Sequence, residues 1–325
     1  MKLVTFEVKT ETGAARRLGV LRGSEIIDLN AAYGSYLGTV RGIHRWQELA
    51  EALVPPDMLR FIEGGEISME ACRKTLEYFE REGRHEGQDG ARLIYRINEV
   101  ALLPPVPRPI SIRDCSAFLQ HHRNMLKGQE LPEDILRLPV HYRASCTDVA
   151  GPEAPILWPT YTEKLDYELE VAICLGKYGV NIPEEKAEEY IFGYTIYNDV
   201  SARDMQVREM HLRFGPGKGK SFQNSNIMGP CLATPDELDV SNLRMVARIN
   251  GEVWSEGNTR DMHFTFPQLI AHLSMDDPLY PGEFIGSGTV GFGCGMELDR
   301  WIKPGDVVEL EIEGIGILRN RVEGR

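Results

Sequence analysis

The sequence predicts a β-rich, mixed α+β fold in which a large C-terminal part follows a smaller N-terminal part. Apolar runs of strand length, rich in β-branched and aromatic residues, recur after residue 105, and glycines separate them. The run Leu103-Pro-Pro-Val-Pro-Arg-Pro109 is stiff and extended, which is typical of a boundary between domains. We therefore expect one domain at residues 1–104 and a second at residues 105–325.

The N-terminal part combines short strands with two helices. Strand patterns cover residues 3–8, 17–21 and 25–29, and glycines near them mark turns. Helical spacing of apolar residues follows over 43–61, where two prolines interrupt it, and over 68–81. We find no catalytic pattern in this part, so the chemistry is expected after residue 104.

Composition and charge restrict the partners. With 325 residues and 42% hydrophobic content, the chain can bury a large core. Its 36 basic and 49 acidic residues give a net charge of −13, which disfavours nucleic acid and anionic membranes as partners. An anionic ligand would need a local cation.

The cysteines and the hydropathy indicate the compartment. Six scattered cysteines without a CxxC pair favour reduced thiols, and no apolar run approaches the length that spans a membrane. We therefore expect a cytoplasmic protein.

The stretch from Lys164 to Ile173 alternates polar and apolar residues, as a strand does. Side chains two apart in a strand share a face, so Asp166, Glu168 and Glu170 would line up about 7 Å apart. A solvated strand face is one interpretation of this pattern. Carboxylates at such spacing repel each other unless water or a cation screens them, so a cation site is the other interpretation.

A second segment favours the cation site. The apolar, aromatic run that begins at Tyr190 ends abruptly in Asn198-Asp199, which places an acid where a strand meets a loop. Oxygen ligands from Glu168, Glu170 and Asp199 would suit Mg²⁺, Mn²⁺ or Ca²⁺ better than zinc.

Two glycine-rich runs resemble nucleotide motifs but fail their requirements. The run Gly219-Lys-Ser221 lacks the glycine that a Walker motif needs five positions before it, because Phe214 stands there. Gly286-x-Gly288-x-x-Gly291 has glycine spacing suited to a dinucleotide, but further glycines and a proline oppose a following helix. We expect a loop that approaches the ligand, with Thr289 offering a hydroxyl.

Four segments together resemble the fumarylacetoacetate hydrolase family, and they occur in the family's order. They are Glu168-Leu-Glu170, Tyr197-Asn-Asp-Val-Ser-Ala-Arg-Asp-Met-Gln206, Gly219-Lys-Ser-Phe222 and Gly286-Ser-Gly-Thr-Val290. The Asn-Asp-x-Ser-Ala-Arg-Asp run is the specific part of the match. The resemblance implies a small β-rich N-terminal domain, a β-roll or β-sandwich catalytic domain with flanking helices, and a homodimer.

The resemblance also implies the members of the site. Asp114 and His121 match an acid and a base that the family holds at this separation, and His121 is favoured over His122. Glu297 would orient that histidine. The implied set comprises metal ligands (Asp114, Glu168, Glu170, Asp199), catalytic residues (His121, Glu297, Lys220) and substrate contacts (Arg143, Gln206, Thr289).

The implied activity is a metal-dependent hydrolase, with Mg²⁺ or else Mn²⁺ or Ca²⁺, that cleaves a carbon–carbon bond. Its substrate would be a small anionic 1,3-diketo or 2-oxo acid of the fumarylacetoacetate, fumarylpyruvate or acylpyruvate type, as in the catabolism of aromatic compounds. Isomerases, decarboxylases, hydratases and dehydratases share the scaffold and stay open as alternatives, as does a metal-stabilised binding protein without turnover. No GxSxG run supports a serine hydrolase.

Overall fold

The computed structural model describes residues 1–11, 13–82, 86–87 and 90–324, and it is β-rich with open sheets, as predicted. The larger sheet contains, in spatial order, β4 (Ile94–Arg96), β3 (Glu25–Asp28), β2 (Gly13–Arg22), β1 (Lys2–Thr10), β14 (Asn226–Ala233), β12 (Ile191–Asp199), β11 (Glu170–Leu175), β17 (Phe284–Gly286), β6 (Ile112–Cys115) and β7 (His141–Ala144). Two short strands flank it, β5 (Ala101–Leu102) beside β1 and β8 (Val149–Ala150) beside β14.

A second sheet packs in the C-terminal part. Its order is β16 (Glu252–Asn258), β15 (Arg244–Ile249), β18 (Val307–Ile312), β19 (Gly316–Glu323) and β9 (Ile156–Leu157), while β10 (Leu165–Asp166) pairs separately with β13 (Ser201–Ala202). The predicted Asn250-Gly251 turn joins β15 to β16, and both residues have the positive φ that such a two-residue turn requires.

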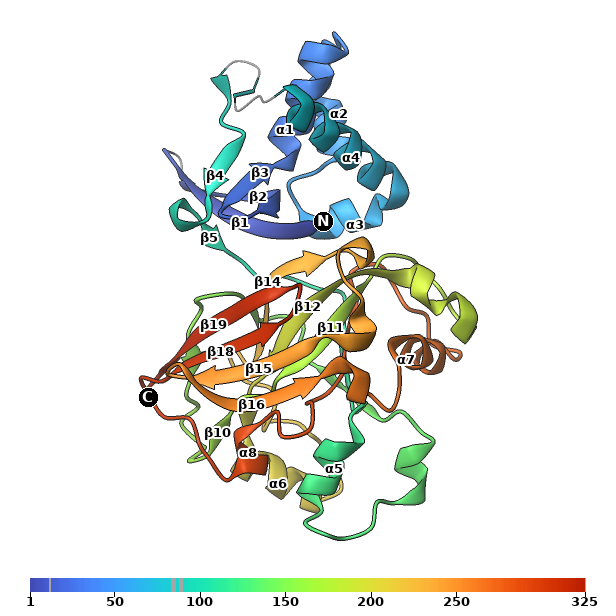
Figure 1. Cartoon of the computed structure of the whole chain (residues 1–325), viewed down its shortest axis with the longest axis vertical. Coiled ribbons are helices and arrows are strands. Elements are labelled where there is room, and N and C mark those ends of the chain that lie inside the picture. Colours follow the sequence, from blue (N-terminus) through green and yellow to red (C-terminus); the bar gives the residue numbers. More distant parts are fainter. Residues whose placement is uncertain (12, 83–85, 88–89, 325) are drawn as a thin grey trace.

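The α-helices are short except for one. They are α1 (Leu29–Ser35), α2 (Trp46–Leu53), α3 (Met58–Glu63), α4 (Gly65–Glu82), α5 (Leu119–Met125), α6 (Arg203–His211), α7 (Phe266–Leu273) and α8 (Gly295–Leu298). In Figure 1 the first four gather with β1 to β5 in the upper part, and the rest surround the lower sheets. In the described ranges, no helix has both the length and the apolar character needed to cross a membrane.

The helical pattern predicted over 43–61 forms two helices. Pro55 and Pro56 separate α2 from α3, because proline lacks an N–H and restricts the residue before it. Asp57 then caps α3, with its carboxylate accepting from the Arg60 N–H at 3.0 Å.

The N-terminal strands continue the sheet of the C-terminal part. Leu3 of β1 lies opposite Leu232 of β14, and the Thr5 hydroxyl donates to the carbonyl of Pro105 in the proline-rich run at 2.5 Å. One sheet therefore spans the expected boundary between 104 and 105. The division into two domains stays a prediction that a cut in the chain would have to test.

The central stretch from Lys164 to Ile173 forms two strands instead of one. Between β10 and β11, Glu168 makes an isolated bridge to Cys294. Every residue of β11 is buried, with Val171 and Ile173 packing into one core cluster and Ala172 into another. The solvated strand face is therefore excluded, since the acids of this stretch are buried as well.

Candidate metal centre and active site

Four buried carboxylates converge beside the large sheet. Asp114 comes from β6, Glu170 from the start of β11 and Asp199 from the end of β12, while Glu168 lies between β10 and β11. One oxygen from each lies within 4.8 Å of the others, and none of the four residues is more than 6% exposed. The structure thus brings together the four acids that the resemblance implied as metal ligands.

Strand register explains the convergence. Asp114 lies opposite Gly286 of β17, and Gly286 lies opposite Ala172 of β11, two residues after Glu170. On the other side, the residue of β12 opposite Glu170 precedes Asp199 by two positions. Because residues two apart share a face of a strand, the three carboxylates meet on one side of the sheet.

Two buried cations contact the acids but do not balance the total negative charge of the cluster. The Lys220 ammonium donates to Glu168 Oε2 at 2.5 Å and to Asp199 Oδ2 at 2.7 Å, and Arg203 Nη1 lies 2.7 Å from Glu168 Oε1. The four carboxylates outnumber the two cations, and Arg203 is also shared with the buried Asp166, so negative charge is in surplus in a site where no residue is more than 6% exposed. A buried surplus of this kind is costly unless protons or a metal compensate it.

The acids differ in how readily they stay ionised. Burial raises the pKa of Asp114 and Glu170 well above the usual range, and neighbouring acids raise it further. Burial also raises the pKa of Asp199, although Lys220 opposes it. Burial also tends to raise the pKa of Glu168. Lys220 and Arg203 outweigh this effect and hold the pKa of Glu168 below its usual range.

The cluster has the features that a divalent cation needs. Asp114 Oδ1, Glu170 Oε1 and Asp199 Oδ1 are buried and accept no hydrogen bond. A Cβ at Gly286 would lie 2.4 Å from Asp114 Oδ1 and 3.1 Å from Glu170 Oε2, so the missing side chain preserves the space around these oxygens. Because all the donors are oxygens and carry surplus charge, the residues fit Mg²⁺, Mn²⁺ or Ca²⁺.

A histidine and a glutamate from two short helices lie beside this cluster. His121 Nδ1 of α5 is 3.0 Å from Glu297 Oε2 of α8. The other carboxylate oxygen of Glu297 accepts from Asn124 Nδ2 at 2.8 Å and from the Phe292 N–H at 2.9 Å. Glu297 is thus fixed, and it faces the histidine that the resemblance implied as the base.

The neighbouring histidine has a different environment. His122 Nε2 contacts the Ser116 hydroxyl, and burial, with a smaller contribution from His121, lowers the pKa of His122 to about 4. His122 therefore stays neutral near pH 7, and its Nε2 is bonded to a serine hydroxyl. His121 instead lies beside the Glu297 carboxylate. The two histidines thus differ in environment, and the choice of His121 over His122 stays a prediction.

Lys220 follows a loop held by a glutamate. The Glu209 carboxylate accepts from the backbone N–H groups of Gly217, Lys218 and Gly219 at 2.6–3.0 Å. After Lys220 the chain continues through a turn into β14 rather than into a helix, so the loop does not form a P-loop.

Two of the three expected substrate contacts lie near the acids. Gln206 Oε1 accepts from Arg203 Nη1 at 3.0 Å. Thr289 is buried and follows Gly288, whose N–H donates to Glu170 Oε2 at 3.1 Å. Gly288 has φ +76°, and a Cβ there would lie 2.3 Å from a backbone carbonyl, which accounts for the glycine.

Arg143 is not brought to the cluster. It lies opposite Arg113 on the β6–β7 ribbon, whereas Tyr142 lies opposite Asp114. Since neighbouring residues of a strand point to opposite faces, Arg143 faces away from the acids, and its guanidinium lies 2.7 Å from Asp277 Oδ2.

Three further residues of the site were not among the site residues predicted from the sequence. Tyr142 donates its hydroxyl to Asp199 Oδ2. Asp166 accepts from Arg203 Nε at 2.8 Å and from the Gly295 and Met296 N–H groups at the start of α8. Arg203 stood inside the signature run and Asp166 inside the alternating stretch, so a signal existed for both. Nothing in the sequence distinguished the tyrosine.

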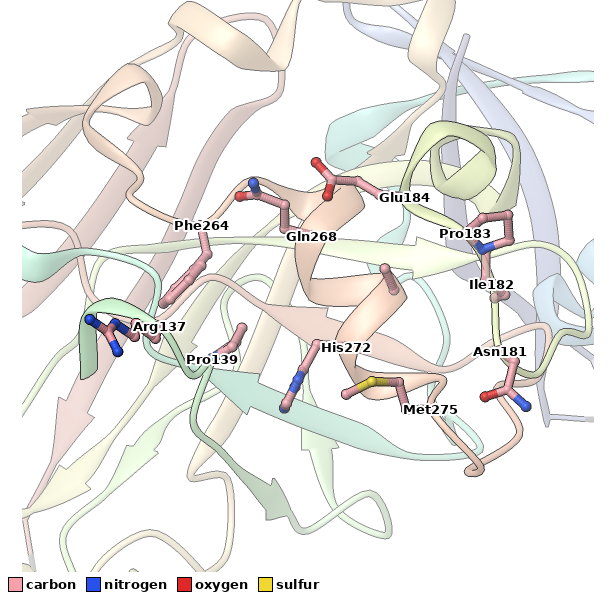
Figure 2. A pocket seen from close by; sticks show the side chains of 11 residues that line it. Arg137, Pro139, Asn181, Ile182, Pro183, Glu184, Phe264, Gln268, His272 and Met275 are labelled. Atoms are coloured by element: carbon pink, nitrogen blue, oxygen red, sulfur yellow. The ribbon is translucent and has the colours of Figure 1, made fainter. Parts of the chain in front are cut away.

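A cavity of about 490 Å³ lies elsewhere on the molecule. Figure 2 shows it beside α7, with His272 and Gln268 on that helix and Arg137 and Pro139 on a facing loop. None of the ten predicted site residues lines it. The chemistry is therefore assigned to the acid cluster and not to this cavity.

Known proteins resemble this chain in sequence. Residues 111–323 match the family model described as fumarylacetoacetate (FAA) hydrolase C-terminal. A human mitochondrial oxaloacetate tautomerase is 30% identical, over 99% of this chain and 91% of its own, and an oxaloacetate tautomerase of Bacillus subtilis is 31% identical, over 83% and 87%.

Solved structures share the fold. A fumarylacetoacetate hydrolase from Exiguobacterium antarcticum has a TM-score of 0.71 at 25% identity, covering 99% of this chain and 100% of that one. A maleylpyruvate hydrolase from Sphingobium sp. SYK-6, in complex with manganese(II) and pyruvate, has a TM-score of 0.69 at 23% identity and covers 99% of each chain.

Proposed function

Because the chain belongs to the fumarylacetoacetate hydrolase family, we propose that it is a metal-dependent enzyme that interconverts the keto and enol forms of a 2-oxo dicarboxylic acid. The observation that carries the proposal is the buried four-acid cluster, whose orphaned oxygens and surplus charge suit a divalent cation. The full-length relatives named oxaloacetate tautomerases support this reaction over others of the family.

The residues divide the work. Asp114, Glu168, Glu170 and Asp199 would hold the cation, which when bound draws electron density from the oxygens of a 2-oxo acid and acidifies the adjacent C–H. His121, with Nδ1 directed toward Glu297, keeps Nε2 free to take that proton and return it to oxygen.

Two further groups stabilise charge. The Glu297 carboxylate stabilises the imidazolium that forms when the histidine takes a proton. Lys220, buried and raised in pKa by the acids despite its burial, stays cationic and favours the negative oxygen of the enolate. These steps need no water molecule, so they suffice for a tautomerase.

Carbon–carbon bond hydrolysis is the second candidate, and the His121–Glu297 pair is the observation that favours it. A histidine held by a carboxylate can also take a proton from water, which would then attack a carbonyl of an acylpyruvate. Decarboxylation would use the same enolate without this water.

The substrate carboxylates need cationic or hydrogen-bonding partners. We propose Gln206 and Thr289 for this role, because both lie beside the cluster. Arg143 could serve only after leaving Asp277. If it does serve, Arg143→Gln should raise KM and leave kcat nearly unchanged, and an unchanged KM would remove it from the site.

The test compares substrates and metals. Purified protein with Mg²⁺ or Mn²⁺ should accelerate the change in enol absorbance of oxaloacetate, and EDTA should abolish the acceleration. Acylpyruvates, fumarylpyruvate and fumarylacetoacetate would be assayed in parallel for cleavage products. Cleavage without oxaloacetate turnover would replace tautomerisation with hydrolysis, and turnover of neither class would favour a binding protein.

A homodimer in the cytoplasm stays part of the proposal. The human relative is named as mitochondrial, so the compartment needs its own experiment. Sedimentation of the purified chain would measure the oligomeric state directly.

A further inference from the structure

A second cluster of possible ligands lies beside the first, and its donors are of another kind. His121 Nδ1, Cys294 Sγ and Glu297 Oε2 all lie within 4.8 Å of one another. The acid cluster offers oxygen alone, whereas this one combines nitrogen, sulfur and oxygen. Such a mixed set is preferred by zinc and similar borderline cations over magnesium or calcium.

The distances suit a tetrahedral cation. Glu297 Oε2 lies 3.0 Å from His121 Nδ1 and 3.2 Å from Cys294 Sγ. Zinc–ligand bonds of about 2.0–2.3 Å place tetrahedral ligands about 3.3–3.8 Å apart, so shifts of a few tenths of an ångström would open these two pairs to that spacing.

The surroundings leave a ligand position unfilled. His121 Nδ1 is a buried nitrogen whose near neighbour is Glu297 Oε2 at 3.0 Å, itself a member of the cluster. Cys294 and Glu297 are enclosed, and the His121 side chain is 16% exposed, so a cation would be approached from the histidine side and could keep one water. Three protein ligands with one open position is the pattern of non-structural zinc sites.

The charges also balance. A thiolate and a carboxylate together neutralise a dication. Burial raises the pKa of the Cys294 thiol well above its usual range, and Arg203 only partly opposes this, so the thiolate would form with the cation bound rather than before it. Cys294 also bridges to Glu168 through the backbone, so the second cluster directly adjoins the acid cluster.

We propose that His121, Cys294 and Glu297 form a zinc-binding site that switches off the histidine base. On binding, the Cys294 thiol loses its proton to solvent and the zinc takes the lone pair of His121 Nδ1. The proton of the neutral imidazole then lies on Nε2, which can no longer accept one. Zinc would thus inhibit while magnesium at the acid cluster remains in place. The inhibition, though not the binding, rests on the function proposed above.

The binding test uses cobalt(II) as a spectroscopic substitute for zinc. The full-length protein is saturated with Mg²⁺ to fill the acid cluster and then titrated with Co²⁺. We expect one thiolate-to-cobalt charge-transfer band per chain, which Zn²⁺ abolishes by displacement. Cys294→Ser should remove the band and weaken Zn²⁺ binding by about tenfold or more.

Matched controls locate the signal. Cys146→Ser should keep the band, because Cys146 is a partly exposed free cysteine outside the cluster. Glu168→Gln should keep it too, since Glu168 belongs to the acid cluster. If Cys294→Ser fails to fold by circular dichroism, Glu297→Gln provides the second variant, with the band weakened and shifted.

The outcomes separate the two proposals. A band that survives Cys294→Ser, or that disappears with Glu168→Gln, would overturn the zinc site, as would the absence of any band. If the band behaves as expected, Zn²⁺ should inhibit turnover over the same concentrations, and Cys294→Ser should be about tenfold less sensitive. Binding without inhibition would retain the site and reject His121 as the base.

Discussion

Two ionic clusters lie on opposite faces of the same strand, β6, and they differ in balance. Asp114 faces the acid cluster, where four carboxylates meet two cations and three buried oxygens lack partners. The adjacent Arg113 faces the other way, toward Asp277 at 2.6 Å and Glu283 at 3.2 Å.

The outer cluster is complete. With Arg143 it holds two cations and two anions, and none of its described buried side-chain atoms lacks a hydrogen bond. A balanced cluster needs no further ion, whereas a buried surplus of negative charge is costly unless protons or a cation compensate it. The surplus charge therefore distinguishes the face of β6 that carries the candidate metal site from the face that carries Arg113.

The largest effect is expected from neutralising an acid in the unbalanced cluster. Glu170→Gln should weaken Mg²⁺ and Mn²⁺ binding by at least about 100-fold and abolish metal-dependent turnover. Without metal the variant should be no less stable than wild type, because a repelled buried charge has been removed. Calorimetric titration measures the metal affinity, and thermal unfolding in EDTA measures the stability without metal. Unchanged metal affinity would contradict the assignment of Glu170 as a metal ligand.

His121→Ala tests the base beside that cluster. Loss of a general base should lower kcat by about 10²–10⁴, with little change in KM because the metal still binds substrate. His122→Ala should lower kcat far less, since the His122 ring is bonded to the Ser116 hydroxyl. The loss of kcat in Glu297→Gln should lie between those of the two histidine variants. More than a tenth of the wild-type kcat in His121→Ala would reject the assignment.

Glu283→Gln makes the matching change in the balanced cluster. Arg113 would keep Asp277 but lose its buried partner, so unfolding should become easier by about 3 kcal/mol. Metal affinity should not change. Equal stability losses for Glu283→Gln and Glu170→Gln, measured in urea without metal, would show that the two clusters are not different in kind.

The smallest effect is expected on stability at low pH. Hydrogen bonding to Arg113 lowers the pKa of Asp277 below its usual value of 3.8. The folded state therefore binds fewer protons than the unfolded state near that pH, and stability is lost as pH falls through this range. Because Asp277 is 42% exposed, the loss should stay below about 1 kcal/mol. A pH series of urea unfolding on wild type and Asp277→Asn measures it, and identical curves would contradict it.

Much of the fold class and the family could be predicted, because both depend on local patterns. Strand-length runs with glycines indicated the β-rich class, and the run from Asn198 to Asp204 indicated the family, which the comparisons confirm. The convergence of Asp114 with Glu168 and Glu170 followed from the family motif and not from spacing.

The burial of the acids and the orientation of Arg143 could not be predicted from the alternation of polar and apolar residues. A period of two shows which side chains share a face but not whether that face meets water. The pattern therefore left both a solvated face and a cation site open for Asp166, whose partner in the structure is the buried Arg203. The orientation of Arg143 could not be predicted for a similar reason. The register of β7 against β6 determines that Tyr142, one residue earlier, faces the acids and that Arg143 does not.

The pairing of β1 with β14 has a consequence for how the chain is made. Leu3 leaves the ribosome early, but its neighbour Leu232 is more than two-thirds of the chain away. Until that residue emerges, the Lys2–Leu3 end of β1 lacks its partner strand, although β5 can already pair with Phe6 and Glu7. Loop closure over such a separation is slow. The first segment to be synthesised thus keeps one exposed strand end until β14 exists, and such an end is prone to pair with other chains late in translation.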